Sequence, residues 1–300
     1  MIRDFKYIVT NEDYDKQLHI TAIMKENFNF SSRLRTKIKK NKGMFLNGAE
    51  VPSWIIPKPG DEITIIIPPE KSHFIPEDIP INVVYEDDDL LIVNKQPGIV
   101  VHPTNGHPFH TIANGVAQYM IDTNQSFKIR FINRLDMDTS GLLALAKNSH
   151  SQDSFVKQMH SHRVTKKYVA IVNGIIEEDR GTIDLPIGRP DPEKVARAVC
   201  EDGANCVTHY QVLERFKKGY TFVELTLETG RTHQIRVHLS HIGHPIVGDY
   251  LYGGEKIHLI QRQALHARYL YFDHPVTNKQ LKLEAPIPQD MEAVINKIKK

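Results

Sequence analysis

The sequence predicts a protein of the α+β class, in which strands are mixed with a few helices and the chain is divided into two parts. Two observations predict this. Short apolar runs bounded by turn residues recur along the chain, and only a few segments show helical periodicity. A proline-rich, polar stretch at residues 68–80 has the composition of a semi-rigid linker. We therefore expect a small domain at residues 1–70, a linker at 71–80 and a large domain at 81–300.

Composition excludes several classes of protein. The chain has 300 residues, of which 40% are hydrophobic and 25% charged, so it can form a core and is not disordered throughout. The net charge of +2 does not by itself indicate a nucleic-acid partner. Two cysteines, Cys200 and Cys206, are too few for a disulfide framework or a four-thiolate zinc site. Because the sequence has no apolar signal core and no run of membrane-spanning length, we expect a cytoplasmic protein without membrane contact.

The first part is predicted to contain a basic helix. Residues 31–43 hold six basic residues and no acidic one, with Ser31 or Ser32 as the N-cap and Gly43 at the end. One stripe of this helix carries Arg33, Lys37 and Lys40. A strand with a tight turn is expected at 44–48, and a turn with a closing strand at 59–67. This arrangement resembles the S4 RNA-binding module, which implies that the three cations contact RNA.

The second part begins with a predicted hairpin. Apolar runs at residues 81–85 and 90–94 flank the acidic turn 86–89, and a helix is expected at 111–120. Leu142–Ala146 then reads as a short buried strand. Asp136 lies in the turn before it, where a carboxylate is costly unless a cation faces it, and Arg134 is the nearest candidate. By local chemistry alone, a structural ion pair that holds the turn is the favoured reading.

The remaining elements follow in order. Ser149 and Gln152 predict a capping box for a helix through Met159, and residues 164–174 predict a strand ended by glycine. A second hairpin is expected from residues 206–214 and 220–228. An amphipathic helix ending at Gly243 should place an apolar stripe opposite a polar face of three residues, His233, Arg236 and Ser240.

Several separate motifs resemble one enzyme family. Residues 134–143 read Arg-Leu-Asp-x-x-Thr-Ser-Gly-Leu-Leu, which is similar to the signature of RluA/RluD-type pseudouridine synthases. Asn133 stands where that signature usually has histidine. Further similar runs are Lys-x-x-Gly-x-x-Val-His-Pro at 95–103, Lys-x-Tyr-x-Ala at 166–170 and Gly-Arg-Thr-His-Gln-Ile-Arg at 230–236. The resemblance spans residues 81–290 and implies an α+β catalytic domain with a largely antiparallel mixed sheet and a central cleft.

The resemblance also implies roles for particular residues. Asp136 is the implied catalytic aspartate, paired with Arg236 or, as second choice, Arg231, while Arg134 is a further catalytic candidate. Tyr168 matches the tyrosine that lies against the target base. Other residues are implied to contact RNA: Lys147, Lys166, Lys167, Arg231 and His233. The activity would be isomerisation of uridine to pseudouridine in structured RNA, with ribosomal RNA expected before transfer RNA, no cofactor and no metal, in a monomer without an obligate protein partner.

Three alternatives are weighed against this interpretation. A glycosidase could use Asp136 and Asp138 as paired carboxylates, although a tight turn rarely sets two carboxylates on opposite sides of a sugar. A metal hydrolase could use His238, His241 and His244, but no carboxylate follows at a useful spacing. The third alternative is a non-catalytic RNA-binding protein on the same fold. An isomerisation assay on uridine-containing RNA separates these classes.

Overall fold

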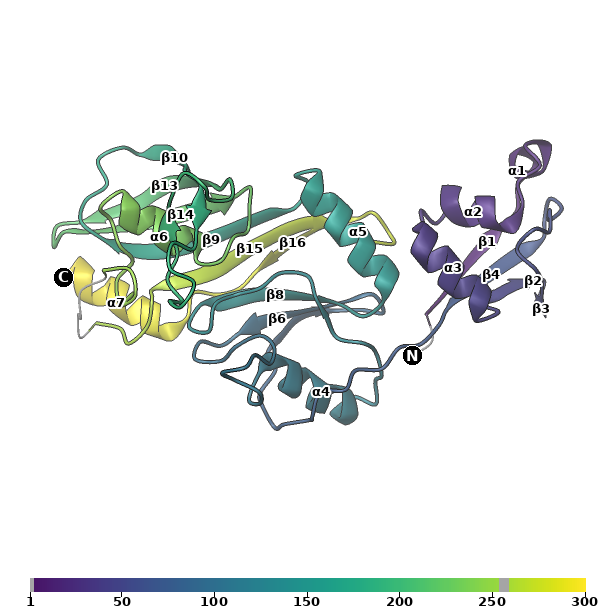
Figure 1. The fold of residues 1–300 in the computed structure, drawn as a ribbon, viewed down its shortest axis with the longest axis horizontal. Coiled ribbons are helices and arrows are strands. Elements are labelled where there is room, and N and C mark those ends of the chain that lie inside the picture. Colours follow the sequence, from purple (N-terminus) through teal and green to yellow (C-terminus); the bar gives the residue numbers. More distant parts are fainter. Residues whose placement is uncertain (1–2, 254–258) are drawn as a thin grey trace.

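The computed structural model describes residues 3–253 and 259–300, which form an elongated molecule (Figure 1). Residues 1–2 and 254–258 of the two predicted domains lie outside the described residues. The N-terminal unit occupies one end of the molecule, and helices α6 and α7 lie at the other (Figure 1). In the described part of the chain, no helix is long and apolar enough to cross a membrane.

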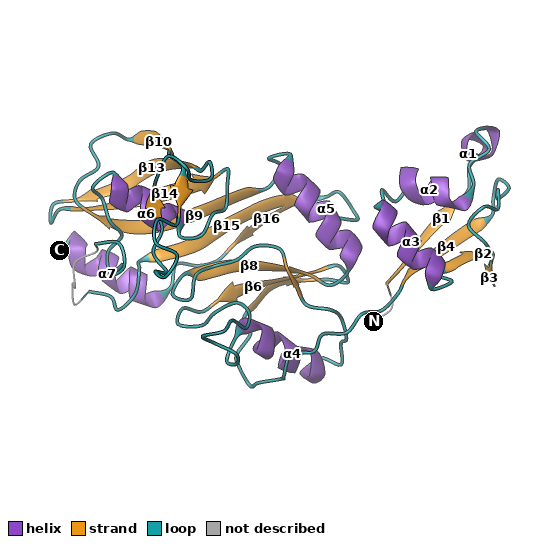
Figure 2. Ribbon diagram, viewed as in Figure 1, coloured by secondary structure: helices purple, strands orange, loops and turns teal. Residues whose placement is uncertain are grey.

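A four-stranded antiparallel sheet and three helices make up the N-terminal unit (Figure 2). The strand order is β1-β4-β2-β3. The strands are β1 (Arg3–Ile8), β2 (Met44–Leu46), β3 (Ala49–Glu50) and β4 (Glu62–Ile67), and the helices are α1 (Asn11–Asp15), α2 (Ile20–Glu26) and α3 (Ser32–Lys40). The predicted basic helix and both predicted strand segments are therefore confirmed.

The basic helix α3 ends differently from the expectation. Ser31 caps its start, since its hydroxyl accepts a hydrogen bond from the Leu34 amide at 3.3 Å. At the other end Lys42, not Gly43, takes the left-handed conformation, with φ of 54°. Gly43 is required for another reason, because a Cβ atom there would lie 2.5 Å from the carbonyl oxygen of Ile66. The absence of a side chain at Gly43 thus allows the backbone that follows helix α3 to lie close to strand β4.

The rest of the chain is organised on a ten-stranded sheet with the main order β10-β13-β14-β9-β15-β8-β6-β5. Its strands are β5 (Val83–Glu86), β6 (Leu90–Lys95), β7 (Arg130–Phe131), β8 (Ser140–Ala146), β9 (Thr165–Asn173), β10 (Arg180–Asp184), β13 (Val207–Phe216), β14 (Tyr220–Leu227), β15 (Leu265–Asp273) and β16 (Gln280–Glu284). A two-stranded sheet pairs β11 (Ile187–Gly188) with β12 (Ala198–Val199). Among the described strand pairs of the large sheet, only β8 and β15 run parallel. Both predicted hairpins and the predicted strand 164–174 are confirmed.

Helices cover both faces of this sheet (Figure 2). They are α4 (Ile112–Asp122), α5 (Ser149–His160), α6 (Gln234–His241) and α7 (Gln289–Lys299). The main core joins apolar residues of α4, α6 and α7 to Leu143 and Leu145 of β8. A second core joins Phe155 of α5 to Leu142 and Ala144 of the same strand. Because β8 is buried on both faces, its sequence is continuously apolar rather than alternating.

The capping box predicted at Ser149 is wrong by one residue. Asn148 is the N-cap of α5, and its side-chain oxygen accepts a hydrogen bond from the Ser151 amide at 2.9 Å. Ser149 instead begins the helix, and its buried hydroxyl has no hydrogen-bond partner among the described residues. Asparagine and serine are almost equally good N-cap residues, so a contact with another part of the fold determines which of the two is the cap. That contact is a hydrogen bond from the Asn148 amide to the buried carboxylate of Asp89 at 2.8 Å.

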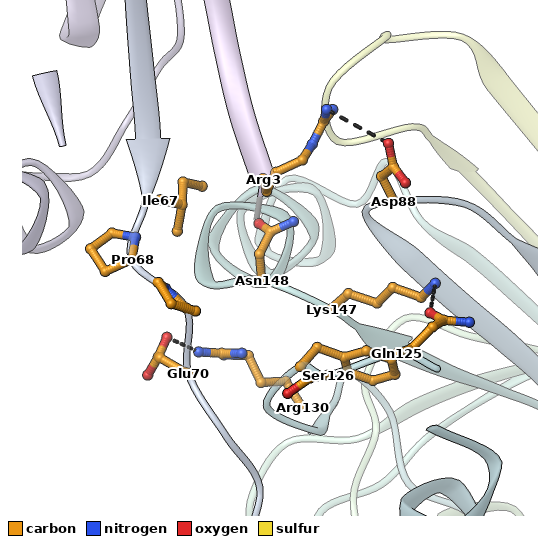
Figure 3. A pocket seen from close by; sticks show the side chains of 12 residues that line it. Arg3, Ile67, Pro68, Glu70, Asp88, Gln125, Ser126, Arg130, Lys147 and Asn148 are labelled. Atoms are coloured by element: carbon orange, nitrogen blue, oxygen red, sulfur yellow. Dashed lines mark hydrogen bonds and ion pairs between the residues drawn. The ribbon is translucent and has the colours of Figure 1, made fainter. Parts of the chain in front are cut away.

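The N-terminal unit is joined to the larger sheet by partly buried polar contacts. Arg3 forms an ion pair with Asp89 at 2.8 Å, and Glu70 pairs with both Arg130 and Lys37. Figure 3 shows Arg3, Glu70 and Arg130 among the residues that line a cavity at this junction. The cavity measures about 50 Å³ and has room for only one or two water molecules. Residues 68–82 between the two units hold no helix or strand. We propose that the boundary predicted at 71–80 divides two domains that pack directly together.

His150 provides a test of this junction. Its ring lies 5.4 Å from that of Phe5 and 4.9 Å from that of Phe30, and only 6% of the residue is exposed. Burial lowers the pKa of His150 to about 4, against the opposing effect of the nearby Asp89 charge. A histidine with a lowered folded-state pKa contributes stability above its ordinary pKa of about 6.5, and this stability is lost as pH falls towards 4.

We therefore expect His150→Leu to flatten the acid side of the stability profile. The free-energy difference between pH 7 and pH 4 should shrink by roughly 2–3 kcal/mol relative to wild type, because leucine cannot bind a proton. Urea unfolding monitored between pH 4 and 7 measures this difference. His160→Gln, which changes an exposed histidine of the same helix, is the matched control. Identical pH slopes in wild type and His150→Leu would contradict the burial of this ring at the junction.

Candidate active site

Asp136 lies in the turn that leads into strand β8. The Thr139 amide closes this turn by donating to the Asp136 carbonyl at 3.1 Å. Gly141 follows with φ of 112°, and a Cβ atom there would lie 2.3 Å from the carbonyl oxygen of Ala267 in β15. Only glycine permits this close approach of β8 to β15. The glycine of the sequence motif therefore fixes where the Asp136 turn sits relative to the centre of the sheet.

Arg236 is the cation that faces Asp136. Its Nη1 lies 3.0 Å from Asp136 Oδ2, while Nε and Nη2 contact the two oxygens of Asp249 at 2.7 and 2.9 Å. The Arg236 side chain is 9% exposed and that of Asp249 is 1% exposed, whereas that of Asp136 is 27% exposed. Burial alone would lower the pKa of Arg236, but the two carboxylates raise it above its ordinary value. Arg236 therefore stays charged and holds one face of Asp136.

The local prediction that Arg134 pairs with Asp136 is wrong. Arg134 is exposed, and it makes no ion pair with any residue in the described ranges. Arg231 is also exposed; it lines the same cavity as Asp136 but forms no ion pair with it. Sequence proximity favours Arg134, but the fold brings in Arg236 from 100 residues further along the chain. The pairing implied by the resemblance is the one that the structure contains.

Asn133 holds the segment before Asp136 against β8. Its side-chain amide donates to the Leu142 carbonyl at 3.1 Å, and its oxygen accepts from the Ala144 amide at 2.8 Å. The side chain thus makes the two hydrogen bonds that a neighbouring strand would make. The departure from the histidine of the family signature is compatible with a well-fixed turn at Asp136.

Lys95 is a feature of the site that sequence reasoning did not single out. Its ammonium group is buried and donates three hydrogen bonds of 2.8 Å, to the carbonyls of Gln96, Ile99 and Met137. Burial lowers its pKa to about 7, although the charges of Asp138 and Asp136 act in the opposite direction. Because Met137 follows Asp136 directly, Lys95 ties the turn to the end of β6. The available signal was a lysine that ends an apolar strand just before a Pro-Gly turn.

Tyr168 lies on β9 beside Asp136. The ring is almost fully buried in the main core, and its hydroxyl has no hydrogen-bond partner among the described residues. Burial, and then the nearby Asp136 charge, raise the pKa of Tyr168, so the phenol stays neutral. Tyr168 and Asp136 line one cavity of about 630 Å³. A cavity of this size accommodates a nucleotide.

The helix predicted to carry His233 and Arg236 on one polar face is different in the structure. Helix α6 begins at Gln234, and all of residues 234–239 are buried, so the helix is not amphipathic in the predicted sense. His233 precedes it in a left-handed conformation with φ of 58°. Its Nδ1 lies 2.7 Å from the Tyr252 hydroxyl, and its Nε2 lies 3.9 Å from Asp136 Oδ2. Tyr252 was not predicted to be part of the site.

A second cavity of about 670 Å³ adjoins the first. The two share six lining residues, which are Ile132, Met159, Lys166, Leu227, Gly230 and Arg231. Lys166 makes no hydrogen bond or ion pair within residues 3–253 and 259–300, and burial lowers its pKa. Lys167 points elsewhere and pairs with Glu224 at 2.6 Å. Lys147 is nearly buried and contacts Glu86 at 2.8 Å and Gln125 at 2.9 Å, so it is not available to a phosphate.

The histidines of the metal-hydrolase alternative do not form a site. His238 is buried, with Nδ1 2.9 Å from the Thr208 hydroxyl and Nε2 3.0 Å from the Leu185 carbonyl. Both ring nitrogens are therefore occupied. Where the structure describes the chain, one cluster has metal-ligand spacing, namely Asp87, Asp89 and His274. His274 and Asp87 bond to each other at 2.7 Å, and Asp89 is occupied by Arg3, Asn148 and Ser151.

Comparison with known proteins decides between the remaining classes. Residues 89–241 match the family described as RNA pseudouridylate synthase. The chain is 44% identical over 273 residues to an uncharacterized RNA pseudouridine synthase, YlyB, of Bacillus subtilis, covering 89% of this chain and 90% of that protein. The chain belongs to the RNA pseudouridylate synthase family. Its activity is thus that of an isomerase, and neither the glycosidase nor the non-catalytic alternative is favoured.

Other relatives place this synthase within the family. It is 40% identical over 243 residues to the ribosomal large subunit pseudouridine synthase D of Haemophilus ducreyi, covering 77% of this chain and 74% of that protein. This similarity confirms the RluA/RluD type. The solved structure of human RNA pseudouridylate synthase domain containing 1 is similar with a TM-score of 0.59 and 32% identity, over 72% of this chain and 87% of that one. The predicted α+β fold with a mixed, mostly antiparallel sheet is confirmed.

Proposed function

We propose that this synthase isomerises uridine in ribosomal RNA and that Asp136 is its catalytic aspartate. The relatives named for the large ribosomal subunit support the choice of RNA. The observation that carries the assignment of Asp136 is its position, since its carboxylate is held by Arg236 at 3.0 Å and lines a cavity large enough for a nucleotide. A cytoplasmic location and a monomeric state belong to the same proposal.

The chemistry requires a carboxylate in this position. Pseudouridine formation breaks the bond between ribose C1′ and uracil N1, and positive character develops on the sugar. A carboxylate beside the sugar can stabilise that charge, attack the carbon or accept a proton. Arg236 holds Asp136 in place through its Nη1, and the neutral ring of Tyr168 offers an apolar surface to an extruded base. Because the reaction is an isomerisation, this proposal includes no cofactor.

Mapping pseudouridines in total RNA from cells with and without the gene tests this function. We expect one or a few uridines of ribosomal RNA to lose their modification in the cells that lack the gene, and to regain it when the wild-type gene is restored. Loss of modification only in transfer RNA would overturn the choice of substrate. No change at any uridine would overturn the function itself.

We further propose that the basic helix α3 contacts RNA, as the S4 resemblance implies. Arg33 and Lys40 are exposed on this helix and can meet phosphates. Lys37 differs from them, because its ammonium pairs with Glu70 at 2.8 Å across the junction. We therefore assign RNA contact to Arg33 and Lys40 and assign Lys37 a role in holding the two units together.

Lys166 provides a direct test of the RNA path. Because its ammonium has no partner among the described residues and lines both cavities, we expect Lys166→Gln to remove one phosphate contact. RNA affinity should fall, and the slope of log affinity against log salt concentration should flatten by about 0.7–0.9. Filter binding of a transcript that carries the mapped uridine, at several salt concentrations, measures both quantities.

Lys167→Gln is the matched control, because the neighbouring lysine is already paired with Glu224. Its salt slope should stay at the wild-type value. If the two variants weaken RNA binding equally, the two cavities do not form the RNA path.

A further inference from the structure

His233 has a left-handed backbone conformation. Its φ of 58° lies in the left-handed region, which non-glycine residues rarely occupy, and such residues cluster at functional sites. The conformation ends the preceding turn and directs the imidazole into the cavity that also holds Asp136 and Tyr168. Its Nε2 lies 3.9 Å from Asp136 Oδ2, a gap that an oxygen of a bound nucleotide can bridge.

Tyr252 determines which ring nitrogen of His233 carries the proton. The Tyr252 oxygen accepts a hydrogen bond from the Arg197 backbone amide at 2.8 Å and lies 2.7 Å from His233 Nδ1. Since the amide already donates to this oxygen, the phenolic hydrogen is directed towards Nδ1. Nδ1 is then the acceptor, and the single proton of the neutral ring sits on Nε2. Tyr252 is itself held, because its ring lies 5.0 Å beneath the Arg236 guanidinium.

The surroundings of His233 keep this ring neutral. Burial lowers the pKa of His233, and the charges that face it act on this pKa in opposite directions. Two are carboxylates, Asp136 and Asp249, and two are guanidinium groups, Arg236 and Arg197. A neutral ring with its N–H directed into the cavity is an electrophile that cannot readily give up its proton. A neutral imidazole serves in this way in triosephosphate isomerase.

We propose that His233 is a neutral hydrogen-bond donor to the detached uracil, and that Tyr252 is the positioning residue that fixes its Nε2–H tautomer. The proposal rests on the proposed function and assigns His233 a role beyond RNA contact. When the C1′–N1 bond breaks, the electron pair stays with uracil, and its negative charge spreads onto the ring oxygens. A donated N–H stabilises this anion without transferring the proton.

The neutral state matters for the second half of the reaction. An imidazolium would protonate the uracil anion and leave a neutral ring that attacks C1′ poorly. With a neutral donor the anion persists, carbon C5 bonds to C1′, and the C5 hydrogen then leaves to solvent as a proton while N1 takes one up. No electrons are gained or lost overall, so the step needs no oxidant or reductant.

The tautomer can be observed without RNA. In protein labelled with ¹⁵N-histidine, the spectrum distinguishes a protonated ring nitrogen from an unprotonated one, and the His233 signals are those absent from His233→Gln. We expect an unprotonated Nδ1 and a protonated Nε2 in wild type and in the control Tyr250→Phe, which alters an exposed neighbouring tyrosine. In Tyr252→Phe, which lacks the hydroxyl, the two tautomers should mix. A wild-type His233 protonated on Nδ1 would overturn the assignment.

Kinetics tests the role in isomerisation. Single-turnover reactions use RNA from cells that lack the gene. The wild-type enzyme must first be shown to modify this RNA. If the wild-type enzyme fails to do so, the proposed function is refuted rather than this inference. We expect Tyr252→Phe to react about tenfold more slowly at saturating RNA, with unchanged RNA affinity. Because the hydrogen bond to Nδ1 favours the neutral ring, its loss raises the pKa of His233. The acid limb of the rate–pH profile should therefore move to higher pH by up to about one unit.

Three results distinguish this role from a structural one. Tyr250→Phe should keep the wild-type rate and profile. His233→Gln, which keeps an N–H donor, should retain more activity than His233→Leu. A slower Tyr252→Phe enzyme whose tautomer and rate–pH profile match wild type would show only a packing role for Tyr252 and would overturn the proposal.

Discussion

Replacing Asp136 with asparagine should abolish isomerisation while leaving the fold nearly intact. The amide has the shape of the carboxylate but no charge, so the nucleophile, base or electrostatic partner is lost. We expect the rate to fall by at least about 10³-fold. Stability should fall by only about 1 kcal/mol, because Arg236 keeps its two contacts with Asp249 and Asp136 is partly exposed. Release of tritium from 5-tritiated uridine in RNA measures the rate, and urea unfolding measures the stability.

Asp138→Asn is the matched control for this experiment. Asp138 lies two residues away, and its carboxylate makes no hydrogen bond with any described residue. It should keep most of the activity. An active Asp136→Asn enzyme would refute the assignment, and equal loss in both variants would favour a mechanism with paired carboxylates.

The largest effect on stability is expected from Asp249→Asn. This change leaves the buried Arg236 guanidinium with a single, partly exposed counter-charge. Breaking one side of a buried ion pair typically costs about 3–5 kcal/mol, because the remaining charge is poorly solvated. The midpoint of urea unfolding should therefore fall strongly. Some activity should survive in the folded fraction, since Asp136 itself is unchanged.

Glu284→Gln is a suitable control for Asp249→Asn. It breaks the ion pair between Glu284 and Arg268. Because the glutamate side chain is 51% exposed and the arginine side chain 25% exposed, the change should cost no more than about 1 kcal/mol of stability. Comparable loss of stability in the two variants would contradict the buried character of the Arg236 site. Together with Asp136→Asn, these variants separate the carboxylate that supports chemistry from the one that supports the fold.

Local sequence patterns predicted the elements whose partners lie nearby in the chain. The two hairpins and β8 followed from short apolar runs and turn residues. The pairing of Asp136 could not be predicted from local chemistry, because Arg236 and Asp249 come from 100 and 113 residues further on. Lys95 was missed for a related reason. Its role depends on three carbonyls that converge only in the folded chain, and the apolar strand and Pro-Gly turn beside it do not by themselves predict a buried ammonium.

The capping error at α5 and the misjudged helix α6 have a common physical cause. In both, residues were assigned to solvent or cap positions by periodicity, whereas tertiary contacts determined their environment. Asn148 rather than Ser149 is the N-cap of α5 because its side chain donates a hydrogen bond to Asp89. Residues 234–239 of α6 are all buried because the main core and the small sheet of β11 and β12 pack around this helix. The resemblance supplied what the pattern could not, namely the pairing of Asp136 with Arg236.

The position of β15 has a consequence for synthesis of the chain on the ribosome. Strands β8 and β9 are close in sequence, yet β15, made from residues 265–273, lies between them in the sheet. Until this late segment has emerged, β8 has no partner on that side, and the Gly141 turn beside Asp136 has nothing to pack against. Parallel and long-range pairings of this kind form slowly. The N-terminal unit can fold early, while a nascent chain that ends before residue 265 should expose the edges of β8 and β9 and should depend on chaperones to avoid aggregation.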